Sequence, residues 1–200
     1  MLLYGSTDSG HSYKIRSFLL LTATPHRYQW IDLSLARQQR PAAFIAASPF
    51  GEVPVLVHQG KVLCQSNAIL SCLAQQSGQF TGGKEQQAAL EWLAWEANRI
   101  GFSVPNYRFA LHWSPQAPEV MAYLHARLLA DLATLEDQLA GRDFLLASEP
   151  SIADISCSAY LFWLDQISIV ETDWPNIKRW LSAIRQLPHW QSPNIAMQGI

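Results

Sequence analysis

The first third of the chain alternates short apolar strands with helical stretches. Period-two alternation or compact apolar runs predict strands at MLLYG, HRYQWIDL, VPVLVH and KVLC. Helices are expected over residues 12–23, 41–47 and 66–75. The predicted order is βαβ followed by αββα. The first two strands are joined through a helix and should be parallel, whereas the short Gln59-Gly60 turn makes the last two an antiparallel hairpin.

The pattern changes after a polar, glycine-rich segment, QQSGQFTGGK, which predicts a linker. Beyond it no strand signal returns, and apolar residues recur at helical spacing up to about residue 187. We therefore expect an α/β domain over residues 1–76, a linker over 77–84 and an all-helical domain over 85–200. The fold class is α/β plus all-α.

The segment PSIADIS contains a helix-start signal. Ser151 can cap the first turn, while Asp154, three residues later, can reach back to the backbone N–H of the cap. We interpret Asp154 as a folding residue and not as a catalytic one.

Composition narrows the possible partners. The chain has 200 residues, 49% of them hydrophobic, and a formal net charge of -2, so no basic surface favours nucleic acid. Cys64, Cys72 and Cys157 form no CxxC pair, which is typical of a reducing compartment. No apolar run is long enough to span a bilayer. We expect a cytoplasmic protein without a membrane segment, whose ligand is a small molecule or a second copy of the chain.

Metal and nucleotide chemistry have no sequence support. The six histidines are scattered, without an HExxH motif or a Cys/His cluster. A P-loop and a GxGxxG fingerprint are also absent from the sequence. We therefore expect no metal and no nucleotide cofactor.

The stretch GEVPVLVHQGKVLCQSNAIL indicates where a ligand binds. Pro54 cannot donate to a sheet ladder, so it must stand at a strand's first residue, on an edge or in a bulge. Ser66 comes where the apolar strand gives way to a helix, a place where a serine oxygen can cap free N–H groups. Together the two residues predict a binding edge beside a helix N-terminus.

The order of elements, VPVLV, QSNAIL and the PSIAD box together resemble the glutathione S-transferase superfamily over essentially the whole chain. The resemblance implies a thioredoxin-like N-terminal domain that binds glutathione as co-substrate. It also implies a cis bond before Pro54, so that Val53 offers its backbone to the cysteinyl residue of glutathione. Gln65, Ser66 and the start of the following helix would hold the γ-glutamyl group.

The resemblance places the thiol-activating residue in the loop after the first strand. Ser9 falls on the catalytic position of the bacterial-like and theta-like classes and is our first choice. Ser12, His11 and Tyr4 remain alternatives. We expect Ser12 to be an N-cap. His11 falls where some relatives have an asparagine near the glutathione sulfur. Tyr4 stands where the tyrosine-using classes place their catalytic tyrosine.

The other implied contacts lie further along the chain. Gln38 and Arg40, with Arg37, follow the second strand, where family members meet the glycyl carboxylate. Glu52 departs from classes with lysine at this position, and its charge should not help to bind an anionic tripeptide.

The helical domain would supply a pocket for a hydrophobic electrophile, with candidates Tyr107, Arg108, Trp113 and Trp163. Phe50 matches a position that some classes insert into a partner subunit, which predicts a homodimer.

Three functions follow from these observations. The first is a detoxifying transferase that conjugates glutathione to a small hydrophobic electrophile. The second is a binding or interaction protein of the same fold without conjugating activity. The third is glutathione-dependent peroxide or disulfide reduction, although its usual marker, a cysteine in the loop over residues 6–12, is absent.

Overall fold

The computed structural model describes residues 1–146 and 149–198, which divide into two units. Unit 1 comprises residues 1–79 together with the chain from Leu187 on, and unit 2 comprises residues 80–186. The elements of unit 1 are β1 (Leu2–Gly5), α1 (Gly10–Leu21), β2 (Arg27–Trp30), the 3-10 turn η1 (Arg37–Gln39), α2 (Ala42–Ala47), β3 (Val55–His58), β4 (Lys61–Cys64), α3 (Ser66–Ser77) and α9 (Pro193–Ala196).

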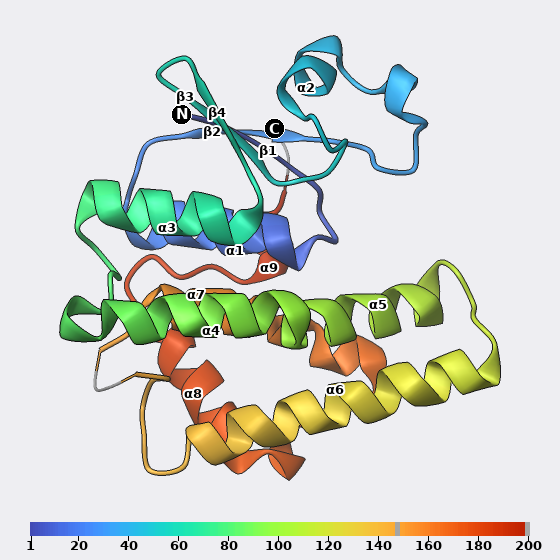
Figure 1. Ribbon diagram of the computed structural model, residues 1–200, viewed down its shortest axis with the longest axis vertical. Helices are drawn as coiled ribbons and strands as arrows, with labels where there is room; N and C mark the ends of the chain where they lie inside the picture. The colour runs from blue at the N-terminus through green and yellow to red at the C-terminus, as the bar shows by residue number, and fades with distance from the viewer. Residues whose placement is uncertain (147–148, 199–200) are drawn as a thin grey trace. The chain divides into compact units, whose positions relative to one another are not determined.

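The four strands form one mixed sheet in the order β2-β1-β3-β4. β1 and β2 are parallel, whereas β3 is antiparallel to both β1 and β4. Helices α1 and α3 cover one face of the sheet and α2 the other (Figure 1). Because both faces are covered, Val55 and Leu56 are both buried although they are consecutive. The predicted α/β plan is confirmed.

The turn between β3 and β4 has the predicted hairpin geometry. Gln59 and Gly60 have φ angles of 49° and 74°. Two consecutive positive φ angles match the type I′ turn, whose twist agrees with that of the strands it joins. The hairpin pairs Val55 with Cys64, so the segment before Pro54 lies beside the start of α3.

Unit 2 is helical. Its elements are η2 (Gly83–Glu85), α4 (Gln86–Asn98), α5 (Ile100–His112), α6 (Pro118–Gln138), α7 (Ile152–Ser158), η3 (Ala159–Ile167), η4 (Glu171–Asp173) and α8 (Pro175–Arg185). α4 packs against α5 and α7, and α5 packs against α6. Within η3 the chain kinks at Trp163, whose φ of -123° and ψ of 22° lie outside the helical region.

The beginning of α7 is stabilised by the predicted capping box. The Ser151 side chain accepts a hydrogen bond from the Ala153 N–H at 3.2 Å, and Asp154 accepts one from the Ser151 N–H at 2.8 Å. Asp154 also accepts from the Leu145 N–H at 2.8 Å and the Trp180 Nε1–H at 2.9 Å. Burial raises the pKa of the Asp154 carboxyl, while these hydrogen bonds lower it. One carboxylate therefore joins α7, α8 and the loop before α7.

The extent of the helical domain differs from the expected 85–200. Residues 187–198 pack with unit 1. The Tyr13 hydroxyl donates to the Gln191 carbonyl at 2.8 Å, and α9 lies against α1. These contacts join positions far apart in the chain, which a local periodicity cannot reveal.

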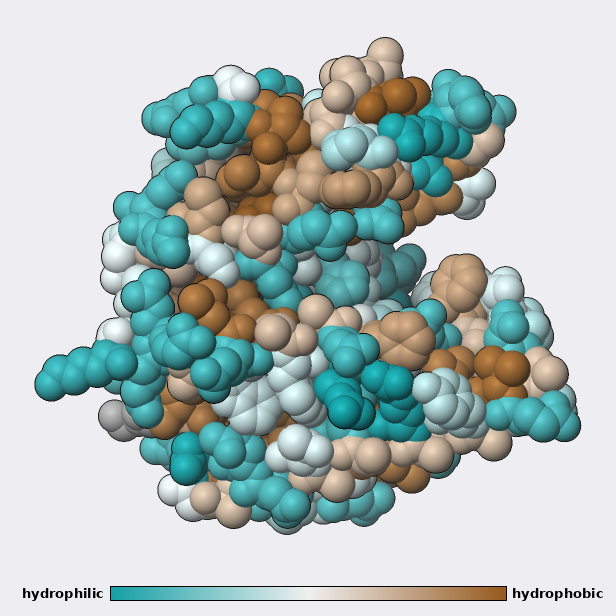
Figure 2. All heavy atoms as spheres, in the orientation of Figure 1, coloured by the Kyte–Doolittle hydropathy of each residue, from teal (hydrophilic) through white to brown (hydrophobic). Residues whose placement is uncertain are grey.

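The surface is mixed. On the face drawn in Figure 2, hydrophobic residues stand in small groups among polar ones. Within the described residues, no helix has the length and hydropathy that crossing a membrane requires.

We predict that Asp154→Ala lowers the free energy of unfolding by about 3 to 5 kcal/mol, because several buried donors lose their acceptor together. Asp154→Asn should cost less, since its Oδ1 still accepts. Urea unfolding of both variants measures this, with exposed Asp137→Ala as the control expected within about 0.5 kcal/mol of wild type. A cost below about 1 kcal/mol for Asp154→Ala would contradict the role described.

Candidate active site at the helix N-termini of unit 1

Ser9 is the N-cap of α1. Its Oγ accepts a hydrogen bond from the Ser12 N–H at 3.1 Å. The expectation that Ser12 is the N-cap is therefore wrong, and the helix begins at Gly10 instead of residue 12. Capping uses the Ser9 oxygen as an acceptor and leaves its own O–H able to donate to another group.

Ser12 has a structural role. It is fully buried, and its Oγ accepts from the Ser6 N–H at 3.3 Å. A Cβ on Gly5 would come within 2.9 Å of the Ser12 Cβ, so the end of β1 and the first turn of α1 need glycine to approach this closely. Ser12 therefore shapes the loop in which Ser9 is presented.

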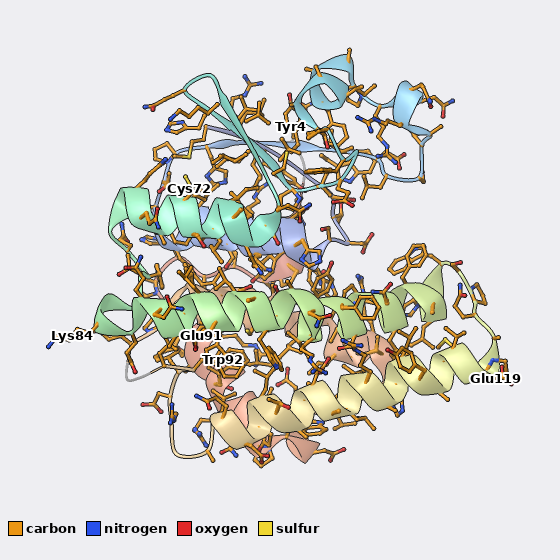
Figure 3. All side chains as sticks on the ribbon, viewed as in Figure 1. Tyr4, Cys72, Lys84, Glu91, Trp92 and Glu119 are labelled. Carbon is orange, nitrogen blue, oxygen red and sulfur yellow. The ribbon has the colours of Figure 1, made fainter. Side chains whose placement is uncertain are left out.

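Tyr4 lies in the core. It is only 3% exposed and packs with Ile31, Phe44 and Val55. Its ring meets that of Phe44 edge to face, with centroids 5.6 Å apart. Figure 3 places Tyr4 on the sheet, on the side of α2. Packing explains this tyrosine without a catalytic role.

The start of α3 presents Gln65 and Ser66. Ser66 is the first helical residue and not the cap; the cap position is taken by Gln65. Gln65 has φ 67° and ψ 112°, a conformation that a side chain makes unfavourable and that is found most often at functional sites. The first backbone N–H groups of α3 have no acceptor within the helix and can bind an anion.

Lys14 joins the two helix starts. It is fully buried, and its Nζ lies 3.3 Å from Ser66 Oγ and 2.8 Å from Asn67 Oδ1. His11 Nδ1 lies 3.5 Å from Ser66 Oγ. The sequence analysis missed this role of Lys14; a lysine between the apolar residues Tyr13 and Ile15 was the available signal.

The bond between Val53 and Pro54 is cis, which confirms the implication of the resemblance. Among the described hydrogen bonds, none uses the backbone N–H or C=O of Val53. β3 begins only at Val55, which pairs with Tyr4. An extended ligand can therefore add to the chain at Val53.

Glu52 lies beside Gln65. Its Oε2 accepts from the Gln65 Nε2–H at 3.2 Å, and its backbone carbonyl accepts from the Ser48 hydroxyl at 3.0 Å. The Cys64 thiol has a raised pKa, first because it is partly buried and second because of the Glu52 charge. Glu52 thus brings a negative charge to the start of α3.

Arg37 and Arg40 bind loop carbonyls. Arg40 donates from Nε to the Leu35 carbonyl at 3.0 Å and from its two terminal nitrogens to Gly51 at 2.8 Å and Leu33 at 3.0 Å. Arg37 donates to the Ser48 carbonyl at 2.8 Å. Both arginines therefore fix the loop before Val53, whereas their contact with a glycyl carboxylate, like that of exposed Gln38, stays a prediction.

Three of the four residues expected in the electrophile pocket lie together in unit 2. The Arg108 guanidinium lies over the rings of Trp113 and Trp163, at 4.9 and 5.1 Å. Arg108 also donates from Nε to Gln166 Oε1 at 2.7 Å. The fourth residue, Tyr107, contacts the ring of His125 instead.

A separate pocket of about 290 Å³ lies beside the C-terminal end of α1 and is lined by unit 1 residues that include Leu19, His26 and Trp190. Ser9, Val53 and Ser66 are not among its lining residues. Within residues 1–146 and 149–198, no group of three or more His, Cys, Asp or Glu side chains could hold a metal ion.

Comparison with known proteins defines the class. Residues 8–76 match the family model "Glutathione S-transferase, N-terminal domain", and residues 118–183 match "Glutathione S-transferase, C-terminal domain". Together the matches span more than half of the chain. The chain therefore belongs to the glutathione S-transferase superfamily, as its sequence predicted.

Individual relatives are similar along nearly their full length. The disulfide-bond oxidoreductase YfcG of Escherichia coli is 28% identical over 200 residues, covering 94% of this chain and 90% of that protein. A crystal structure of a glutathione S-transferase from Pseudomonas fluorescens is 30% identical, with a TM-score of 0.85 over 96% of this chain and 98% of that one. The family and these relatives support glutathione S-transferase activity for the chain.

A more distant structure agrees in fold. The glutathione transferase homologue from Lodderomyces elongisporus, solved with two glutathione molecules per subunit, is 21% identical. Its TM-score is 0.87 over 98% of both chains.

We predict that Arg40→Lys loosens the loop over residues 33–51, because lysine keeps the charge but cannot reach three carbonyls from one planar group. Amide hydrogen exchange in this loop should become faster, and the free energy of unfolding should fall by about 1 to 2 kcal/mol. Arg27→Lys, at an exposed position of β2, is the matched control. Unchanged exchange in the loop would show that the three hydrogen bonds do not hold it.

Proposed function

We propose that this chain is a glutathione transferase whose thiol site lies where the N-termini of α1 and α3 meet the cis Val53–Pro54 edge. The observation that carries the proposal is this convergence: Lys14 and His11 of α1 reach Ser66 of α3, and Tyr4 pairs with Val55. Both helix starts carry partial positive charge, which suits an anionic peptide and a thiolate.

Each part of the tripeptide has a place in this arrangement. The cysteinyl backbone pairs with Val53, beside Pro54, as a single residue added to the strand. The γ-glutamyl carboxylate binds the Ser66 hydroxyl and the first N–H groups of α3, near Gln65 and Lys14. Gln38 and Arg40 are the candidates for the glycyl carboxylate.

Ser9 provides the chemistry in this proposal. Its hydroxyl donates a hydrogen bond to the glutathione sulfur, which stabilises the thiolate relative to a free thiol with a pKa near 8.5. The thiolate then forms a carbon–sulfur bond with an electrophile; in a substitution the leaving group departs with its electron pair, and the thiol proton has already passed to water. Thiolate stabilisation and proximity supply most of the rate.

The electrophile and the assembly are further parts of the proposal. The Trp113 and Trp163 rings around the Arg108 guanidinium offer aromatic surface, which suits a small hydrophobic electrophile and a role in detoxification. Phe50 is 60% exposed, as expected of a residue that enters a partner in a two-fold homodimer. Cys64, Cys72 and Cys157 form no disulfide within the described residues, which supports a reducing compartment such as the cytoplasm.

The proposal predicts that Ser9→Gly lowers conjugation of glutathione to chlorodinitrobenzene at neutral pH by about a hundredfold, the typical loss of one donor to a developing anion. Glutathione affinity should stay nearly constant. The rate should recover as pH rises, because without the donor the bound thiol ionises only at higher pH.

Glycine is the informative substitution because it removes the hydroxyl at a capping cost of only a few tenths of a kcal/mol, whereas alanine costs about 1 kcal/mol. Ser9→Thr keeps both cap and donor and should retain most of the activity. If Ser9→Gly has the wild-type pH profile, Ser9 is not the thiol donor.

A second candidate is glutathione-dependent disulfide reduction, favoured by the similarity to the oxidoreductase YfcG. One glutathione thiolate would displace a thiol from the disulfide, and a second would release the other thiol and form glutathione disulfide. The loop over residues 6–12 contains no cysteine, so both attacking sulfurs would belong to glutathione.

The two candidates can be separated with one enzyme preparation. We expect faster turnover of chlorodinitrobenzene than of hydroxyethyl disulfide, with glutathione disulfide as the measured product of the latter. The reverse order would assign the chain to disulfide reduction. Inactivity toward both substrates would reject both candidates.

A further inference from the structure

The γ-glutamyl end of glutathione carries two opposite charges on one carbon atom, an α-carboxylate and an α-ammonium. The start of α3 offers N–H groups, the Ser66 hydroxyl and the Lys14 ammonium, all of which suit the carboxylate. None of these groups carries a negative charge that would complement the ammonium. Recognition of the ammonium needs an acceptor close to Gln65 and Ser66.

Glu52 is such an acceptor. Its side chain is exposed, and its Oε2 is held 3.2 Å from Gln65 Nε2. An ionised carboxylate has about four acceptor positions, so this contact leaves capacity for a ligand. Gln65 itself is uncharged and uses one donor to orient the carboxylate.

The backbone around Glu52 is fixed from both sides. The Ser48 hydroxyl donates to the Glu52 carbonyl, and the Arg40 guanidinium donates to the carbonyl of Gly51. The Glu52 charge is the second cause, after burial, of the raised pKa of the Cys64 thiol, which stands at the end of β4 directly before Gln65. The carboxylate is therefore positioned before a ligand arrives.

We propose that Glu52 is a specificity-determining residue that receives the α-ammonium of the γ-glutamyl group, while the start of α3 receives the carboxylate. This inference rests on the proposed function. It also revises the expectation that Glu52 disfavours an anionic tripeptide. The ligand group nearest to the Glu52 carboxylate is the positive ammonium, and this local charge matters more than the net charge of the ligand.

Two ligand analogues test the inference by calorimetry. S-hexyl glutaryl-cysteinyl-glycine lacks only the ammonium, and S-hexyl aminobutyryl-cysteinyl-glycine lacks only the α-carboxylate. Wild-type protein should bind S-hexylglutathione about five- to tenfold more tightly than the glutaryl analogue, as expected for one charge-assisted contact at a partly exposed position.

Glu52→Gln should abolish this preference and leave the penalty for the aminobutyryl analogue unchanged. The double variant Glu52→Gln, Gln65→Glu moves the acid to the neighbouring side chain and should restore the preference. Glu119→Gln in unit 2 changes the net charge equally and should leave all three affinities unchanged.

The outcomes are distinct. If Glu52→Gln weakens S-hexylglutathione and the glutaryl analogue equally, Glu52 acts on the fold or on general charge and the inference is wrong, although the proposed function stands. If the wild-type protein binds none of the three ligands, the proposed function fails and the inference fails with it.

Discussion

The hydrogen bonds from the buried Lys14 ammonium to Ser66 and Asn67 hold the starts of α1 and α3 together. A fully buried charge is costly unless polar groups surround it, so these partners are needed for folding as well as for ligand binding. Because Ser9 lies five residues before Lys14, at the start of the same helix, the same contacts set where the Ser9 hydroxyl stands relative to the γ-glutamyl site. Packing and the geometry of the site therefore depend on one side chain.

The loops around this centre are rigid for independent reasons. Arg40 binds three carbonyls of the segment before Val53, and Ser12 fastens the loop before α1. A site that is held in shape before the ligand arrives loses less entropy on binding. In unit 2, Asp154 has a comparable role, since a single carboxylate organises the junction of three segments.

Local patterns predicted the fold well because strands, the Gln59-Gly60 turn and the Ser151–Asp154 box are short-range features. The sequence analysis was wrong or incomplete where the role of a residue depends on contacts with residues far away in the chain. Ser9 and Ser12 are both good cap residues by type, and in the structure Ser9 is the cap. The partners of Lys14 lie more than fifty positions away, and Glu52 meets Gln65 only after the hairpin forms. Contacts over such distances in the chain cannot be predicted from the local pattern of apolar and polar residues.

The double use of Ser9 restricts what can replace it. Its oxygen accepts from the Ser12 N–H, and a hydroxyl that accepts a hydrogen bond becomes a better donor through its own hydrogen. Helix capping alone already limits this position mainly to Ser, Thr, Asp, Asn and Gly. Of these residues only Ser, Thr and Asn also carry a polar side-chain hydrogen, so capping and thiol stabilisation together restrict position 9 more than either requirement does alone.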